Sequence, residues 1–271
     1  MDLFGTFREE PLKAGILSDF DGTLAPIVDD PDASRPLPEA VDLLHRLAGR
    51  YRRVAVISGR PAAFLATHLR LADTDGAAAG DGLVAMGLYG LEMADGDQVT
   101  TDPRVLEWLP VVEEVACLAE EQASPGVFVE RKGLSVTLHY RTVPGAAGWA
   151  TEWAAGQSER TGLVRHPARM SEELRPPLPV DKGSVVADLA GGLTSVCFVG
   201  DDVGDLPAFA ALDDLARAGG VTTVKVGVRS EEAPPELLAG ADLVVDGPDG
   251  VVDLFSSLLA PPPASPPPTG R

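Results

Sequence analysis

The stretch 15–27 reads GILSDFDGTLAPI, in which an apolar run leads into two aspartates one residue apart, followed at once by Gly-Thr. Side chains alternate along a β-strand, so Asp19 and Asp21 face one side while the strand continues, and Gly22 lets the backbone turn away. In open α/β sheets, ligands bind beyond the carboxyl ends of the strands. The stretch therefore predicts a ligand site at a strand end. An ordinary surface turn is the alternative, since Asp and Gly are common turn residues.

Three further stretches bring polar groups to comparable positions. The strand predicted within RRVAVISGR ends at Ser58, and Arg60 follows two residues later. Lys182 begins a helix predicted over 182–190. A strand predicted over 194–199 runs directly into GDDVGD, whose acids are Asp201, Asp202 and Asp205. A helix-capping role for Ser58 and a solvated Lys182 are the alternatives, but four such stretches in one chain favour a shared site.

Strands and helices alternate along the two outer parts of the chain. The predicted strands are 14–19, 52–60, 194–199, 221–228 and 241–247, and 83–92 is a further strand or a hairpin. The predicted helices are 38–49, 62–71, 182–190, 234–239 and 249–259, and another helix opens over 205–212. Such alternation is typical of an α/β fold, with a Rossmann-like parallel sheet and helices on both faces.

The pattern changes between 102 and 176. The predicted elements there are, in order, a long helix, a hairpin, a second helix and a pair of short strands: 103–119, 127–141, 145–160 and 163–176. The hairpin is expected to turn at Lys132, and the last two strands to lie on either side of His166. This order predicts an α+β module inserted between two halves of the α/β repeat, 1–101 and 177–259.

Composition limits the class of protein. A chain of 271 residues that is 45% hydrophobic, with a mean hydropathy near zero, can bury a sizeable core. The net charge of -19 opposes binding to nucleic acids, whose phosphates are bound by Lys and Arg. No stretch approaches the roughly 18 apolar residues of a membrane helix, and MDLFGTFREEP lacks the order of a signal peptide. We therefore expect a cytoplasmic protein that binds neither nucleic acid nor membrane.

Three smaller expectations follow from composition. The two cysteines, Cys117 and Cys197, lie in apolar patterns and are expected to be buried packing residues. The proline-rich stretch 260–271 is expected to be disordered. We also expect a monomer.

The gathered side chains favour one kind of chemistry. Carboxylates in one cleft repel one another unless a cation neutralises them, and hard oxygen ligands suit Mg²⁺. A serine and a lysine beside them supply a hydrogen bond and a positive charge for an anion. Phosphoryl transfer depends on such positioning and charge neutralisation. The residues therefore favour hydrolysis of a phosphate monoester.

DFDGT, SGR, the lysine of DKG and GDDVGD resemble, in this order, the four motifs of haloacid dehalogenase (HAD) superfamily phosphatases. Within that superfamily the chain resembles the trehalose-6-phosphate phosphatase family from about residue 14 to 255, through DFDGTLAPI, GLYGLE, ERKGLSVTLHYR, ELRPPLPVDKG and GDDVGDLPAF. Two positions depart from the family's common pattern, which has His where Tyr89 stands and Thr where Gly204 stands. The resemblance implies a HAD core with a C2-type inserted cap.

The resemblance also implies roles for the residues of the core. Asp19 attacks phosphorus and becomes an aspartyl-phosphate, and Asp21 protonates the leaving sugar oxygen and later activates water. The groups implied to bind Mg²⁺ are the carboxylates of Asp19, Asp201 and Asp205 and the carbonyl of Asp21, with Asp202 in support. The residues implied to hold the phosphoryl oxygens or contact the substrate are Thr23, Ser58, Arg60 and Lys182.

The inserted module is implied to be a cap that closes over the site and recognises a sugar. Glu130, Lys132 and Glu173 are implied to contact sugar hydroxyls; ordinary cross-strand ion pairs are the alternative. Three functions stay open: a trehalose-6-phosphate phosphatase, a phosphatase for another sugar or pseudo-disaccharide phosphate of the sucrose or glucosylglycerol type, and a non-catalytic protein that binds a sugar phosphate.

Overall fold

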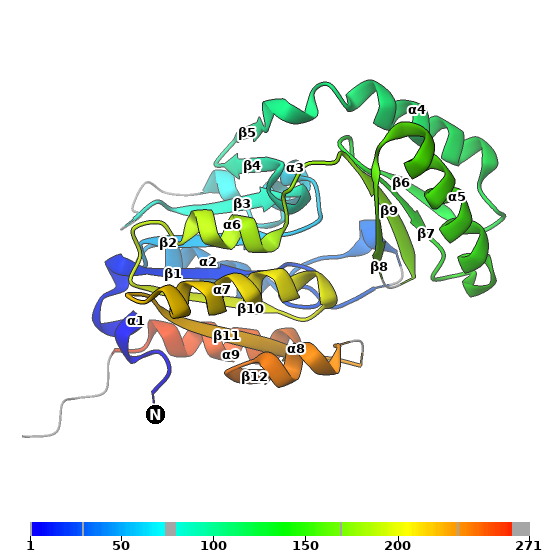
Figure 1. Ribbon diagram of the computed structural model, residues 1–271. Coiled ribbons are helices and arrows are strands. Elements are labelled where there is room, and N and C mark those ends of the chain that lie inside the picture. Colours follow the sequence, from blue (N-terminus) through cyan, green and yellow to red (C-terminus); the bar gives the residue numbers. More distant parts are fainter. Residues whose placement is uncertain (1, 29, 74–79, 169, 232, 262–271) are drawn as a thin grey trace, which may run out of the picture.

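The computed structural model describes residues 2–28, 30–73, 80–168, 170–231 and 233–261 (Figure 1). Within these residues the main sheet has eight strands, of which the first six in spatial order are parallel and the last two antiparallel. In that order they are β12 (Leu243–Asp246), β11 (Thr222–Arg229), β10 (Ser195–Gly200), β1 (Ala14–Ser18), β2 (Arg53–Ile57), β3 (Leu83–Gly87), β4 (Glu92–Asp95) and β5 (Gln98–Thr101).

The centre of this sheet is where the strand order reverses. From β1 the chain adds β2 and β3 on one side, whereas β10, β11 and β12 extend the sheet on the other. Every residue of β1 and β10 is buried, which agrees with their largely apolar sequences, because a parallel strand is covered on both faces. A crevice forms beyond the carboxyl ends of the two strands at such a reversal, and ligands bind there.

Helices cover both faces of the main sheet (Figure 1). The helices whose apolar residues pack on one face are α1 (Gly5–Glu9), α2 (Pro38–Ala48), α3 (Ala62–His68) and α9 (Gly247–Leu259). Those on the other face are α6 (Lys182–Leu189), α7 (Leu206–Ala218) and α8 (Pro235–Gly240). In α2, for example, Pro38 starts the helix and the buried Val41, Leu44 and Leu47 form its core-facing stripe.

A second sheet lies to one side of the first (Figure 1). Its described strands are antiparallel, in the order β6 (Phe128–Arg131), β7 (Val136–His139), β9 (Ser171–Arg175) and β8 (Val164–Ala168). Helices α4 (Leu109–Gln122) and α5 (Ala147–Thr161) pack on the face that carries Val136 and Leu138. Because side chains alternate, the opposite face carries Glu130, His139 and Glu173. We call the segment 109–175 the inserted module.

The predicted α/β architecture with a separate antiparallel sheet is confirmed, but two predictions for the inserted module are wrong in detail. The long helix predicted from residue 103 is broken: Pro103–Val105 forms a 3-10 turn and α4 begins only at Leu109. His166 does not separate two strands but lies inside β8 together with Pro167. Pro167 is tolerated because β8 is an edge strand, where a missing backbone N–H leaves no partner unpaired.

The cysteine prediction is half wrong. Cys197 is buried in β10 as expected, whereas Cys117 is exposed on α4. The thiol of Cys117 lies 3.4 Å from the guanidinium of Arg131, a residue of β6. The expected disorder of the proline-rich stretch falls on 262–271, outside the described residues. In the part of the chain that the structure describes, no helix is both long and apolar enough to cross a membrane.

Candidate active site

Three buried aspartates meet beyond the carboxyl ends of β1 and β10. Carboxylate oxygens of Asp19, Asp201 and Asp205 all lie within 4.8 Å of one another. Asp19 follows β1, and its backbone N–H donates to the Val199 carbonyl of β10 at 2.8 Å. The two strand ends are thereby held side by side, so the motifs DFDGT and GDDVGD form one acidic cluster although they are far apart in the sequence.

Lys182 projects into this cluster from the start of α6. The helix start is fixed by a reciprocal capping box, in which Asp181 accepts from the backbone N–H of Ser184 at 2.8 Å. The Lys182 ammonium lies 2.6 Å from a carboxylate oxygen of Asp19 and 2.6 Å from one of Asp205, with only 4% of the side chain exposed. Burial lowers the pKa of Lys182, but the Asp19 and Asp205 carboxylates raise it well above its ordinary value. This lysine is therefore a permanent positive charge.

The loop after β10 is organised by its own acids. One oxygen of Asp205 accepts from the backbone N–H groups of Asp201 and Asp202, at 2.8 and 3.1 Å, while the other faces Lys182. Asp202 accepts from the backbone N–H of Gly204 at 2.8 Å and so caps the following turn. Asp205 and Asp202 thus hold the loop in the shape that presents Asp201.

The charges in the cluster do not balance without a further cation. Burial, followed by the neighbouring Asp19 and Asp205, raises the pKa of Asp201 to about 10. Burial also raises the pKa of Asp19 and of Asp205, although Lys182 opposes the shift in both. One ammonium cannot neutralise three buried carboxylates. Oxygen ligands of this kind fit a hard divalent cation, which would restore the ionised form of all three.

Gly22 and Thr23, which follow Asp21 in the chain, both lie against the Asp201 carboxylate. Gly22 has a left-handed backbone, with φ of +79°, and a Cβ atom there would lie 2.0 Å from a carboxylate oxygen of Asp201. The buried Thr23 hydroxyl donates to Asp201 at 3.3 Å. Thr23 was expected to contact phosphate; it is not among the residues that line the pocket, and contact with phosphate stays a prediction.

Gly22→Ala is expected to destabilise the protein by about 1–3 kcal/mol, from backbone strain plus displacement of Asp201. Gly192→Ala is the matched control, because Gly192 has φ of +78° and open space where the Cβ would be. Thermal unfolding with and without Mg²⁺ measures both effects. If the cluster binds a divalent cation, Gly22→Ala should lose the stabilisation that the cation gives and Gly192→Ala should keep it; equal behaviour of the two variants would show that Asp201 is not displaced.

Asp21 lies beside the cluster but is engaged by Arg60. The guanidinium contacts both carboxylate oxygens, at 2.7 and 2.8 Å, and the Ser34 hydroxyl donates to one of them at 2.8 Å. Burial raises the pKa of Asp21, yet these contacts, Arg60 foremost, hold it below its usual range. The arrangement favours the carboxylate form, which suits a base. Arg60 also lies over the Phe64 ring, with its guanidinium carbon 4.9 Å from the centroid.

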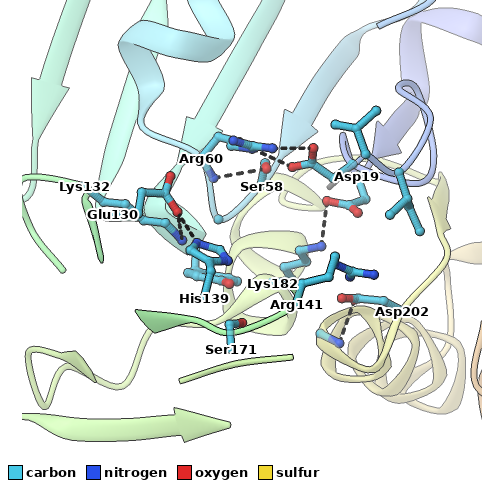
Figure 2. A pocket seen from close by; sticks show the side chains of 16 residues that line it. Asp19, Ser58, Arg60, Glu130, Lys132, His139, Arg141, Ser171, Lys182 and Asp202 are labelled. Atoms are coloured by element: carbon cyan, nitrogen blue, oxygen red, sulfur yellow. Dashed lines mark hydrogen bonds and ion pairs between the residues drawn. The ribbon is translucent and has the colours of Figure 1, made fainter. Parts of the chain in front are cut away.

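A pocket opens between the main sheet and the inserted module. The core contributes Asp19, Asp21, Ser58, Arg60 and Lys182 to its lining, all of them predicted site residues. The module contributes Glu130 and Lys132, as predicted, and also His139, Arg141 and Ser171. Figure 2 shows Glu130, Lys132 and His139 gathered on one side of the pocket, with Asp19 and Asp202 on the other.

The module's polar groups form a connected network. His139 lies 2.8 Å from a carboxylate oxygen of Glu130, and Lys132 lies 3.8 Å from the same oxygen. Burial raises the pKa of Glu130, but His139 and Lys132 lower it below its usual value, so this carboxylate accepts the hydrogen bond and His139 Nε2 donates it. The sequence contained a signal for His139, since the alternation of a strand puts residues 137 and 139 on one face. The register against β6 was needed to place that face toward the pocket.

Glu173 is a predicted site residue that the structure encloses. The residue is 3% exposed and does not line the pocket. Burial raises its pKa, but Lys132 and Arg175 lower it to about 2. Glu173 is therefore an ionised partner of the neighbouring cations in this structure, and a direct contact with a sugar stays a prediction.

The chain is similar in sequence to known phosphatases. Residues 17–236 match the model of a family described as trehalose-phosphatase. The chain is 36% identical over 233 residues to the trehalose-phosphate phosphatase of Mycobacterium avium (strain 104), a match that covers 80% of this chain and 55% of that protein. It is 33% identical over 239 residues to the trehalose-phosphate phosphatase of Mycobacterium leprae (strain TN), covering 81% and 52%. The chain thus spans about half the length of the curated relatives it matches.

Solved structures share the fold. The C-terminal domain of C. albicans trehalose-6-phosphate phosphatase has a TM-score of 0.72 at 22% identity, with 94% of this chain and 95% of that chain covered. A haloacid dehalogenase-like hydrolase from Bacteroides thetaiotaomicron has a TM-score of 0.61 at 17% identity, with 91% and 99% covered. At these identities the likeness concerns the fold, and it confirms the HAD-type core and the additional sheet.

Proposed function

The chain belongs to the trehalose-phosphatase family, as its motifs predicted, and on that premise we propose that it hydrolyses trehalose 6-phosphate to trehalose and inorganic phosphate. The observation that carries the proposal is the position of Asp19, which lies in the pocket beside Lys182 and the other two aspartates of the cluster. A carboxylate held beside a fixed positive charge in a pocket is suited to attack a phosphate ester.

We propose that the reaction has two steps. A carboxylate oxygen of Asp19 attacks phosphorus, the bond from phosphorus to the sugar oxygen breaks, and that oxygen takes a proton from Asp21. Asp21 then accepts a proton from water, whose oxygen attacks the aspartyl-phosphate and releases inorganic phosphate. Because Arg60 favours the Asp21 carboxylate, protonation of Asp21 before the first step would require Arg60 to turn toward the incoming phosphate, which is the more highly charged partner.

The other predicted residues fit supporting roles in this proposal. Ser58 accepts from the Arg60 backbone N–H at 3.2 Å, and its own hydroxyl hydrogen is suited to a phosphoryl oxygen. Lys182 balances charge on the transferring group. We propose Mg²⁺ as the cation, bound by the carboxylates of Asp19 and Asp201 and the carbonyl of Asp21, with Asp205 bound directly or through water. When bound, the ion would neutralise charge on the phosphoryl oxygens.

We also propose the domain division and setting predicted from the sequence. Residues 1–101 and 177–259 would form the core, and 102–176 a cap whose Glu130 and Lys132 contact the sugar. A cap of this kind excludes water and separates sugar recognition from phosphate chemistry. A cytoplasmic monomer completes the proposal, and the mass measured in solution by light scattering tests the monomer.

A different sugar phosphate is the second candidate, and a specific observation favours it. Tyr89 and Gly204, the two residues that depart from the family's common pattern, both line the pocket. A changed lining alters which ester binds best, because specificity is a difference of affinities.

Phosphate release from a panel of esters separates the candidates. We expect kcat/KM for trehalose 6-phosphate to exceed that for sucrose 6-phosphate and glucosylglycerol phosphate by about tenfold to a hundredfold. The reason is that the two competing esters cannot make every buried polar contact that the pocket makes with the preferred sugar. Each substrate is assayed with Mg²⁺ and with EDTA. Faster hydrolysis of either competitor would overturn the substrate assignment, and binding without hydrolysis of any ester would leave the non-catalytic alternative.

A further inference from the structure

Tyr89 adopts an unusual backbone conformation next to the phosphate end of the pocket. It lies in the 3-10 turn Leu88–Gly90, in which three consecutive residues have positive φ: +47°, +60° and +104°. Left-handed conformations are costly for residues other than glycine, and they persist where the surrounding structure holds them. Here the Leu88 N–H donates to the Arg60 carbonyl and the Tyr89 N–H to the Ser58 carbonyl, both at 2.9 Å.

This strained turn places the Tyr89 side chain between the core and the inserted module. On the core side, a Cβ atom at Gly59 would lie 2.6 Å from the Tyr89 hydroxyl, so only glycine leaves room for it. On the module side, the Arg175 guanidinium carbon lies 3.4 Å from the centre of the Tyr89 ring. Burial, with the Glu173 charge, raises the pKa of Tyr89 to about 12, so the hydroxyl stays a hydrogen-bond donor.

The Tyr89 hydroxyl donates to Glu173 of β9 at 3.4 Å. The same carboxylate accepts from Ser135 at 2.7 Å and from Arg175 at 2.7 Å, and it pairs with the Lys132 ammonium at 3.4 Å. Among the residues that the structure describes, four donors therefore surround Glu173, and Tyr89 is the one that comes from the core. The other three belong to the inserted module.

Lys132 and Tyr89 itself are the members of this group that line the pocket. The Lys132 ammonium is 3.4 Å from Glu173 and 3.8 Å from Glu130, and 9% of the lysine side chain is exposed. Glu173 and Glu130 therefore hold the lysine from two sides. Because Glu173 is itself fixed to the core by Tyr89, the position of the Lys132 charge relative to Asp19 depends on that tyrosine.

We propose that Tyr89 is a positioning residue, which acts through Glu173 to set Lys132 against the sugar of a bound substrate. The inference rests on the proposed hydrolysis of a sugar phosphate, and it concerns how the module is placed over the core. Tyr89 is not assigned a contact with the reacting atoms. Its removal is therefore expected to weaken recognition of the sugar more than the attack on phosphorus.

Tyr89→Phe, Lys132→Met and the double variant test the proposal. Each is assayed with the sugar phosphate and with p-nitrophenyl phosphate, which offers the same phosphate but no sugar. Tyr89→Phe should lower kcat/KM for the sugar phosphate, relative to p-nitrophenyl phosphate, by about tenfold, mainly through KM. In the Lys132→Met background it should change that ratio by less than about twofold, because residues that act through one another are not additive.

Tyr51→Phe is the matched control. The Tyr51 hydroxyl is also buried and donates to the Leu258 carbonyl at 2.8 Å, on a part of the core that does not line the pocket. Loss of that bond should lower the melting temperature without changing the ratio between the two substrates. A ratio that changes equally in Tyr51→Phe and Tyr89→Phe would reduce Tyr89 to a stability role and overturn the proposal.

Two further outcomes would overturn the proposal. One is an unchanged ratio between the two substrates, whether both activities fall equally or neither falls, and the other is full additivity of Tyr89→Phe with Lys132→Met. If Tyr89→Phe does not fold, Glu173→Gln replaces it in the same cycle, because the amide keeps the shape but weakens the hold on Lys132. If the wild type prefers another sugar phosphate, the substrate proposal fails and the cycle is measured on that ester. A wild type that cleaves p-nitrophenyl phosphate but no sugar phosphate overturns both.

Discussion

Asp19→Asn is expected to lower kcat by about 10⁴-fold or more, because an amide cannot attack phosphorus and the residues of a catalytic unit do not substitute for one another. The fold should survive. Asn has the shape of Asp, and burial already raises the pKa of the Asp19 carboxyl, so the ionised group is costly at this position. Lys182 keeps its second partner, Asp205, at 2.6 Å.

Steady-state phosphate release and thermal unfolding measure the two effects separately. Asp188→Asn is the control, because Asp188 lies exposed on the same helix that begins with Lys182. It removes the same charge and should leave turnover within about twofold of the wild type. Persistent hydrolysis by a folded Asp19→Asn protein, beyond what contaminating phosphatase explains, would contradict the assignment of the nucleophile.

Asp201→Asn should weaken cation binding without destabilising the metal-free protein. Saturating Mg²⁺ is expected to raise the melting temperature of the wild type by about 5 °C or more, since a ligand that binds the native state at a hundred times its Kd adds about 2.7 kcal/mol. The variant should lose this shift together with at least about 10²-fold in kcat/KM. Without metal it should be as stable as the wild type or more so, because it removes one of three carboxylates that repel one another.

Differential scanning calorimetry with EDTA and with increasing Mg²⁺ tests both parts. The predicted signs are opposite, since the same substitution helps the metal-free protein and harms the metal-bound one. Asp188→Asn again serves as the control and should keep the full shift. An Asp201→Asn protein that gains the wild-type stabilisation from Mg²⁺ would place the cation elsewhere.

Much of the fold could be predicted from the sequence because its signals are local. The runs AGIL and VCFVG are apolar without interruption, as strands buried on both faces tend to be, and both strands lie where they were expected. The prediction of one helix starting at residue 103 was wrong, because it rested on apolar spacing alone. Pro103 and Pro110 each favour the first turn of a helix, and the structure uses them for two separate starts.

The candidate site was predictable in part for the same reason. Acids that follow apolar strands had to lie at one edge of a parallel sheet, and Asp19, Asp201 and Asp205 do. Thr23 shows the limit. It ends the DFDGT motif, two residues after Asp21, but the turn at Gly22 directs its hydroxyl to Asp201 instead of into the pocket. A side chain's direction after a turn depends on φ and ψ values that residue types alone do not specify.

The sequence by itself determined which elements form and which of them end in acidic or basic residues, because strand burial, helix periodicity and turn residues act over a few neighbouring positions. Only the tertiary structure decided which of those groups meet. Arg60 holds Asp21 across 39 residues, and Glu173 is enclosed by Tyr89 and Lys132 from segments more than 40 residues away. Such pairs depend on strand order, register and the placement of one sheet against another. These features are set by the packing of the whole chain and not by any short stretch of it.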